Sequence, residues 1–252
     1  MTKPDPQLTW EEEVKIRLRD WGYTELLTYS MISEKQLDKM KAYKITNPLS
    51  EEWVYMRPSL RPGFLSAMKE NFNNRNELRL FELSKVYHFC EGDLPQEEDM
   101  LIVGLTGDKY FETKGIGEAI LALFGTPGAL DAYGSLTRIG EITLLELSIT
   151  KLSRDANPTK KYTPIQKYPP VVEDMAFIVP DRFEIGQLIS AVKAAHPLIA
   201  DVSLLDVHED TRTLHITYQD PKRNLTGEDV IPIREKLIQL AKTQFGAILK
   251  SS

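Results

Sequence analysis

The sequence VVEDMAFIV, residues 171–179, opens the stretch that decides the fold of this chain. Its β-branched and apolar residues predict a strand, and the segments after it predict a regular succession of elements. We expect a helix, two strands, a long helix and a short strand over residues 184–196, 200–207, 211–219, 227–245 and 247–250. Pro232 is tolerated near the start of the long helix, where a missing amide costs little. This β-α-β-β-α-β order predicts a ferredoxin-like domain.

The first half of the chain predicts strands and helices that alternate irregularly, without a glycine fingerprint. Residues 8–21 predict a helix that Thr9 caps and Gly22 ends, and residues 24–30 predict a buried strand. Further strands are expected over residues 53–57, 78–89, 100–106 and 138–149, and helices over 60–75 and 115–124. Such a succession favours an α+β domain with a mainly antiparallel sheet.

A linker is predicted between the two halves. Residues 153–161 are polar, contain the pair Asn157-Pro158 and lack large apolar side chains, which is typical of a connection between domains. We therefore expect a first domain over residues 1–152, a linker over 153–161 and a second domain over 162–252.

The composition is that of a globular protein with little attraction for nucleic acid in general. Of 252 residues, 42% are hydrophobic and 27% are charged, and a chain of this length can form two cores. The net charge is −6, and residues 162–252 carry 10 Lys and Arg against 12 Asp and Glu, a net of −2. Non-specific nucleic-acid binding needs a basic surface, so any RNA contact must be local.

Several classes of protein are disfavoured by what the sequence lacks. No apolar run is long enough to span a membrane, and the N-terminus has no apolar signal core, so we expect the cytoplasm. The single cysteine, Cys90, excludes an internal disulfide framework. No phosphate-binding loop, nucleophile elbow or zinc-protease motif occurs, and the four histidines lack metal-ligand spacing. We predict no catalytic residue, metal or cofactor site in this chain.

Five short sequences in the first half share one resemblance. They are GYTE at 22–25, TYS at 28–30, NPLSEE at 47–52, MRPSL at 56–60 and LFEL at 80–83. The last three resemble motif 2 of class II aminoacyl-tRNA synthetases, as it occurs in the phenylalanyl-tRNA synthetase β subunit, and the first two, just upstream, resemble the same subunit's sequence. In a working class II site a motif 2 arginine holds the ATP α-phosphate, and Arg57 occupies that place here. The second phosphate-holding arginine belongs to motif 3, which this sequence lacks, so we interpret Arg57 as a structural or interface residue.

The second half resembles the ferredoxin-fold anticodon-binding domain of the same β subunit. The matching sequences are KYPPVVEDMAF at 167–177, LDVH at 205–208, TYQD at 217–220, LTGED at 225–229 and FGA at 245–247. In that family an Asp and a Tyr on the second strand, with a Ser on the third, receive the first anticodon base. The matching positions are Asp206, His208 and Thr211, where a ring stacks on the base and polar groups read its edge. Alternatively, Asp206 and Thr211 only shape the hairpin.

The sequence departs from the family's pattern at several positions. His208 stands where the family has Tyr, Glu173 where it usually has Arg, and Lys250 where it usually has Arg. The segment between Phe124 and Ile139 is shorter than the family's and lacks a His-Pro-Gly-Arg loop. These departures leave the expected fold intact and weaken the expected RNA contact.

The resemblance implies a non-catalytic scaffold. The first domain would pack on a catalytic α subunit that binds ATP, magnesium and phenylalanine, and the second would reach the anticodon of phenylalanine tRNA. The chain alone would be inactive, without a membrane or DNA partner. Two alternatives remain open: the first domain could itself form an acyl-adenylate, which the missing motif 3 disfavours, or the chain could be a stand-alone protein-interaction module, which its acidic charge favours.

Overall fold

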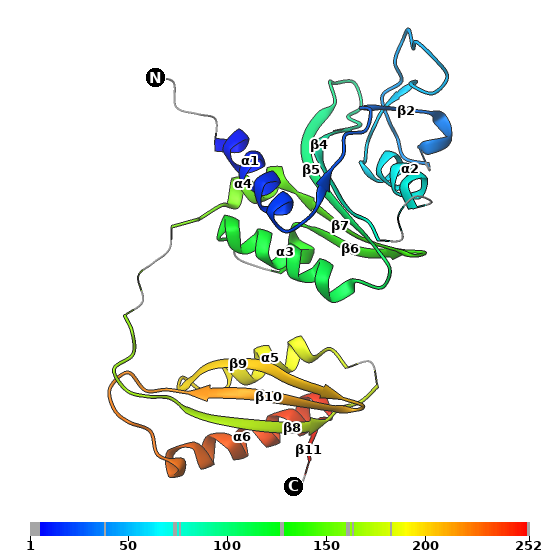
Figure 1. The fold of residues 1–252 in the computed structure, drawn as a ribbon. Helices are drawn as coiled ribbons and strands as arrows, with labels where there is room; N and C mark the ends of the chain where they lie inside the picture. The colour runs from blue at the N-terminus through cyan, green and yellow to red at the C-terminus, as the bar shows by residue number, and fades with distance from the viewer. Residues whose placement is uncertain are drawn as a thin grey trace. The chain divides into compact units, whose positions relative to one another are not determined.

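The structure is a computed structural model that describes residues 6–37, 39–72, 75, 77–126, 129–159, 162, 164–181 and 183–250. The chain divides into two compact units, residues 1–161 and residues 162–252. Figure 1 shows that each unit has a sheet and helices of its own.

The first unit is built on a five-stranded sheet. Its elements are α1 (Pro6–Asp20), β1 (Thr24–Glu25), β2 (Met31–Ile32), η1 (Glu34–Gln36), β3 (Tyr55–Met56), α2 (Arg61–Phe72), β4 (Arg79–His88), β5 (Gln96–Thr106), α3 (Tyr110–Phe124), η2 (Leu130–Ala132), β6 (Gly134–Ile139), β7 (Ile142–Ser148) and α4 (Ile149–Asp155). The sheet order is β1-β4-β5-β7-β6, with β1 parallel to β4 and the other pairs antiparallel. The prediction of an α+β domain with a mainly antiparallel sheet is confirmed.

Helices cover both faces of this sheet (Figure 1). Leu101 and Val103 of β5 lie in one core with α1, α3 and α4, whereas Ile102 lies in a second core with α2. This division follows from the strand, because successive side chains point to opposite faces. At Gly104 a Cβ atom would lie 2.5 Å from Cε1 of Phe64, so the glycine allows α2 to approach β5 closely.

The prediction of a buried strand over residues 24–30 is wrong. Only Thr24 and Glu25 pair with β4, and the apolar side chains of Leu27 and Tyr29 are exposed. β1 is the edge of the sheet, and the chain leaves it after two residues. The carbonyl oxygens of Thr28 and Tyr29 accept hydrogen bonds from a guanidinium group instead of from a strand.

Of the two signals expected at the ends of the first helix, only the one at its C-terminal end is confirmed. Because α1 begins at Pro6, Thr9 lies inside the helix and is not its cap, contrary to the prediction. Gly22 ends the helix as predicted, with a φ of +88° that suits a residue without a Cβ atom. The amide of Tyr23 then donates to the carbonyl of Leu18 at 3.0 Å.

The short helix α4 was not predicted from the sequence. It includes Ser153 and Asp155, which the sequence pattern assigns to the linker. The Ser148 hydroxyl caps this helix by accepting a hydrogen bond from the amide of Lys151 at 3.1 Å. The amide of Asn157 then donates to the carbonyl of Phe124 at 2.8 Å, so the start of the expected linker belongs to the first unit.

The second unit has the predicted ferredoxin-like order. Its elements are β8 (Val171–Ile178), α5 (Ile185–Ala194), β9 (Ile199–His208), β10 (Thr211–Tyr218), α6 (Gly227–Phe245) and β11 (Ile248–Leu249). The sheet order is β11-β8-β10-β9, and every neighbouring pair is antiparallel. β10 lies between the two strands that α5 connects, as a split βαβ unit requires.

Both helices of this unit pack on one face of its sheet. Leu188 and Val192 of α5 and Leu237 of α6 share a core with alternate residues of the strands. Those strand residues include Met175, Phe177, Leu214, Ile216 and Tyr218. Within the described part of the unit no helix packs on the opposite side of the sheet, which we call the open face.

Local signals set both ends of α6. The Asp229 carboxylate accepts a hydrogen bond from the amide of Thr226 at 2.9 Å, as in a capping box. Gly246 ends the helix with a φ of +64°. α6 therefore has the bounds predicted for it, residues 227–245.

Candidate functional site

The open face is defined by the strand registers. On β10 the side chains of Leu214, Ile216 and Tyr218 point toward the helices, so the intervening side chains point away from them. Pairing carries this alternation to the other strands. The open face thus holds Asp201, Ser203, Asp206 and His208 of β9, Thr211, Thr213, His215 and Thr217 of β10, Val172, Asp174, Ala176 and Ile178 of β8, and Ile248 and Lys250.

The three residues predicted to receive an anticodon base lie together on this face. Thr211 pairs with His208, and Thr213 pairs with Asp206, at the end of the sheet where the β9–β10 hairpin turns. Asp206 and His208 lie two residues apart on β9, which separates them by about 7 Å along the strand. The side chains of Asp206 and His208 are exposed. The structure therefore brings an exposed carboxylate and an exposed aromatic ring within reach of one base.

Thr211 is less available than the other two residues. It is only 7% exposed, and its hydroxyl donates a hydrogen bond to Oδ1 of Asp210 at 3.3 Å. To read a base edge, this hydroxyl must exchange the Asp210 carboxylate for the base. Asp206 and His208 need no such exchange, so they are the stronger candidates.

Glu173 does not belong to this face, although we expected its charge to weaken an RNA contact. It pairs with Ile216 in the register and points toward the helices. There its carboxylate forms an ion pair with Arg234 and accepts a hydrogen bond from the Tyr218 hydroxyl at 3.4 Å. Burial, followed by the Glu173 carboxylate, raises the pKa of Tyr218 above its usual range. Glu173 is therefore part of the core polar network.

Two carboxylates lie at the end of the open face away from the hairpin, and each has a side-chain partner. Oδ1 of Asp174 lies 2.6 Å from Nδ1 of His215, and Asp201 forms an ion pair with Lys193 at 2.9 Å. The Lys193 hydrogen bond and charge hold the pKa of Asp201 below its usual range, so this carboxylate is ionised at neutral pH.

In the first unit, Arg57 lies in a buried polar cluster. Arg57 is 3% exposed, and its Nη1 lies 2.8 Å from Oε1 of Glu82, which is fully buried. Nη1 also donates to Oγ1 of Thr28 at 2.9 Å, and Nε donates to the carbonyl of Lys85 at 2.9 Å. The Thr28 hydroxyl donates in turn to Oε2 of Glu82 at 2.8 Å.

This geometry gives Arg57 a structural role. It ties the loop after β1 to β4, because Thr28 lies in the loop, and Glu82 and Lys85 lie on the strand. A cavity of about 510 Å³ lies beside the cluster and is lined by Thr28, Trp53 and other residues, but Arg57 does not line it. The guanidinium is therefore not presented to a nucleotide.

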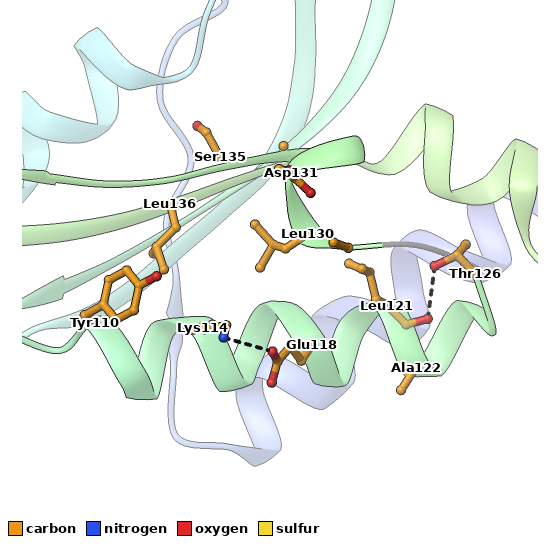
Figure 2. A pocket seen from close by; sticks show the side chains of 12 residues that line it. Tyr110, Lys114, Glu118, Leu121, Ala122, Thr126, Leu130, Asp131, Ser135 and Leu136 are labelled. Atoms are coloured by element: carbon orange, nitrogen blue, oxygen red, sulfur yellow. Dashed lines mark hydrogen bonds and ion pairs between the residues drawn. The ribbon is translucent and has the colours of Figure 1, made fainter. Parts of the chain in front are cut away.

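A larger cavity of about 800 Å³ lies between α3 and β6 (Figure 2). Its floor is apolar, and Leu130 and Leu136 point into it. At the rim Lys114 and Glu118 form an ion pair at 3.5 Å. None of the residues predicted for a site lines this cavity. Its charged lining residues are Lys114, Glu118 and Asp131, and we assign no catalytic chemistry to it.

Within residues 6–250, apart from the gaps given above, no group of three or more His, Cys, Asp or Glu could hold a metal ion. The helices in that part of the chain include none that is both long and apolar enough to cross a membrane.

Comparison with known families gives two matches in the chain. The model of the phenylalanyl tRNA synthetase beta chain CLM domain matches residues 1–146, more than half of the chain. The model of the ferredoxin-fold anticodon binding domain matches residues 166–250. The match thus covers both units, in the order that the sequence resemblance implied.

Individual relatives agree with these matches. The chain is 25% identical to the phenylalanine–tRNA ligase beta subunit of Dehalococcoides mccartyi, over 93% of this chain and 36% of the relative. It is 27% identical to that of Geobacillus kaustophilus, over 97% of this chain and 38% of the relative. The chain therefore spans little more than a third of these relatives. A solved pyrrolysyl tRNA synthetase from Desulfitobacterium hafniense covers 57% of this chain, and 64% of its own, with 15% identity and a TM-score of 0.45.

Proposed function

This chain belongs to the phenylalanyl-tRNA synthetase beta chain family, and from that premise we propose that it is a non-catalytic scaffold and anticodon-binding part of such an enzyme. In this proposal a partner α subunit binds ATP, magnesium and phenylalanine and attaches phenylalanine to tRNA. The first unit packs on that subunit, and the second unit reaches the anticodon. In this proposal aminoacylation takes place in the cytoplasm, where translation consumes charged tRNA.

The observation that carries the proposal is that Asp206 and His208 lie two residues apart on the open face of β9. Both are exposed, they lie on one strand end, and they match the positions where the family binds the first anticodon base. A ring that stacks on a base stabilises binding by roughly 1–3 kcal/mol, and a hydrogen bond to its edge adds about 1 kcal/mol.

These terms alone give weak binding. With a net charge of −2 over residues 162–252, the unit adds little attraction for phosphate. After the entropy lost on association, we expect a Kd around the millimolar range for the isolated chain. Useful affinity then requires the rest of the enzyme to hold the tRNA.

The buried state of Arg57 supports a scaffold role for the first unit. An ATP-clamping arginine must be presented to the nucleotide, whereas Arg57 is held by Glu82 and Thr28. The family assignment favours this role in aminoacylation over a stand-alone interaction module. The isolated chain is expected to be inactive in phenylalanine-dependent ATP–pyrophosphate exchange.

The test compares tRNA charging with amino-acid activation in the assembled enzyme. Asp206→Ala and His208→Ala should each reduce kcat/KM for tRNA about 5-fold or more, because each removes one contact with the base. Neither should change ATP–pyrophosphate exchange. His208→Tyr, which restores the family's residue, should charge tRNA at least as well as the parent enzyme.

Asp201→Ala is the matched control, since Asp201 lies on the same strand and face but at the end away from the hairpin. It should charge tRNA like the parent enzyme. If Asp206→Ala and His208→Ala also charge normally, the assignment of the anticodon base to these residues is wrong.

A further inference from the structure

The outer edge of β6 presents main-chain hydrogen-bonding groups to another strand. β6 is the last strand of its sheet, and the described part of the first unit places no further strand beside it. The amide of Ser148 donates to the carbonyl of Tyr133 at 2.9 Å, so every second pair from there along the β6–β7 ladder is hydrogen-bonded. Leu136 and Arg138 lie between those pairs, so their amides and carbonyls point to the open edge.

The two edges of this sheet differ in what they offer. The edge strand β1 is two residues long, whereas β6 has six residues and contains no proline. Among the described residues, none forms a hydrogen bond with the main chain of Leu136 or Arg138 across the open edge. Native proteins usually shorten, cover or interrupt such an edge, because it is a template for another strand. The β6 edge is therefore available for pairing.

The cavity of about 800 Å³ between β6 and α3 lies beside this edge, and we call it the β6–α3 groove (Figure 2). Its volume is within the range of about 300–1,000 Å³ that is usual for binding pockets. Leu121 of α3 lines it, and Leu130 and Leu136 point into it. Directly opposite side chains of paired strands lie on the same face of a sheet. A residue opposite Leu136 on an added strand would therefore point into the groove.

One charged group on the rim of the groove lacks a partner. Lys114 and Glu118 form an ion pair at 3.5 Å, whereas the exposed Asp131 forms neither an ion pair nor a hydrogen bond with any described side chain. Asp131 belongs to η2, which directly precedes β6, so it lies at the Gly134 end of the groove. A carboxylate at that place favours a basic side chain in whatever binds there.

We propose that the β6–α3 groove binds an extended segment of a partner protein, which pairs with β6 as an additional antiparallel strand. The segment has a large apolar residue opposite Leu136 and a Lys or Arg two positions later, opposite Gly134 and close to Asp131. Antiparallel pairing places this basic residue at the Asp131 end, whereas a parallel strand would place it next to Arg138. The inference goes beyond the proposed function, because no residue of the open face takes part in it.

The combined features of the groove select an extended segment over other occupants. A small apolar molecule would fill the floor but leave the main-chain groups of Leu136 and Arg138 without partners. A helix satisfies its own amides and carbonyls, so it cannot pair with the edge either. An added strand satisfies the edge with its main chain and fills the groove with alternate side chains.

The experiment is a titration of the 252-residue chain, labelled with ¹⁵N and with ¹³C in the leucine methyl groups, with a synthetic peptide. The probe is Thr-Val-Thr-Leu-Thr-Arg-Thr, acetylated and amidated at its ends, which has the proposed apolar and basic residues at the proposed spacing. We expect the amide signals of Leu136 and Arg138 and the methyl signals of Leu130 and Leu136 to shift together with one affinity.

Two N-methylated peptides test whether the probe binds as a strand. The amide of the leucine opposite Leu136 points to β6, so its N-methylation should weaken binding about 10-fold or more. The amide of the threonine that follows points away from β6, and its N-methylation should change the affinity less than about 2-fold. Equal weakening by both methyl groups would contradict pairing with the edge.

Variants of the chain test the direction of the strand and the use of the groove. Asp131→Asn should weaken binding of the arginine peptide about 3-fold or more and leave a peptide with glutamine in place of arginine unaffected. Ala122→Trp places a ring in the groove from an exposed position of α3 and should abolish binding of both peptides. Gly115→Trp is its matched control, since Gly115 is exposed on α3 but does not line the groove.

Three results would overturn the proposal. If the signals of Leu136 and Arg138 do not shift at millimolar peptide, the groove does not bind such a segment. If the same signals shift when the concentration of the chain alone is raised, a second copy of the chain occupies the edge in place of a partner. If Gly115→Trp abolishes binding as Ala122→Trp does, the peptide does not lie in the groove.

Discussion

Removing the guanidinium of Arg57 should destabilise the first unit severely, and Arg57→Met is the variant that tests it. The change leaves the Glu82 carboxylate, fully buried and 2.8 Å from the lost Nη1, without its cation. It also removes the donors to Thr28 and to the Lys85 carbonyl. Breaking one side of a buried pair costs about 3–5 kcal/mol, because a charge is left in a medium of low dielectric constant.

This loss is large compared with the stability of a typical domain, which is about 5–15 kcal/mol. With a denaturant slope of about 2 kcal/mol per molar urea, a loss of about 4 kcal/mol lowers the unfolding midpoint by about 2 M. The double variant Arg57→Met/Glu82→Leu removes the stranded carboxylate as well. We expect it to recover more than half of the loss, since an apolar pair of similar volume is tolerated in such sites.

Tryptophan fluorescence in the full chain is a direct assay, because all three tryptophans, at positions 10, 21 and 53, lie in the first unit. The matched control is Arg138→Met, which removes an exposed ion pair with Asp108 and should cost less than about 1 kcal/mol. Should Arg57→Met unfold within about 0.5 M of the parent chain, or the double variant unfold before the single one, the buried-pair explanation is refuted.

Two further predictions concern other residues. Gly134→Ala should destabilise the first unit by about 1–3 kcal/mol, because its Cβ would overlap the carbonyl oxygen of Glu146. Gly115→Ala, in open space on α3, should stabilise it by about 0.5–1 kcal/mol, and equal effects of the two variants in urea unfolding would contradict this. Burial raises the pKa of Tyr23 and Tyr218 above the ordinary value of 10, so the folded chain keeps these protons. The contribution of the two tyrosines to stability is therefore present in full below about pH 10 and is lost as the pH rises above it. Tyrosinate absorbance should show both rings ionising only on unfolding.

The sequence predicted the second unit well because its signals are local. Strands and helices there are marked by their own periodicity, and α6 is bounded by Thr226 and Gly246 as a capping box and a left-handed glycine require. The positions of Asp206 and His208 on one strand end also follow from the order of elements, since the hairpin is short. No long-range information was needed for these features.

Tertiary structure decided what depends on partners distant in the sequence. Residues 24–30 have β-prone composition, yet only two of them pair, because the edge of the sheet offers one neighbour and Arg57 takes up the carbonyls of Thr28 and Tyr29. Whether Arg57 faces a nucleotide or a buried carboxylate depends on Glu82, a contact that no local pattern encodes.

The same distinction applies to the open face. The sequence by itself determined the family and the fold of the second unit, because these follow from ordered local motifs, and it also predicts which residues receive a base. Only the strand registers decided that Glu173 turns toward Arg234 in the core while Ile178 and Ile248 turn outward beside His208. A side chain's face depends on how each strand is paired, and a shift of one residue in that pairing reverses it.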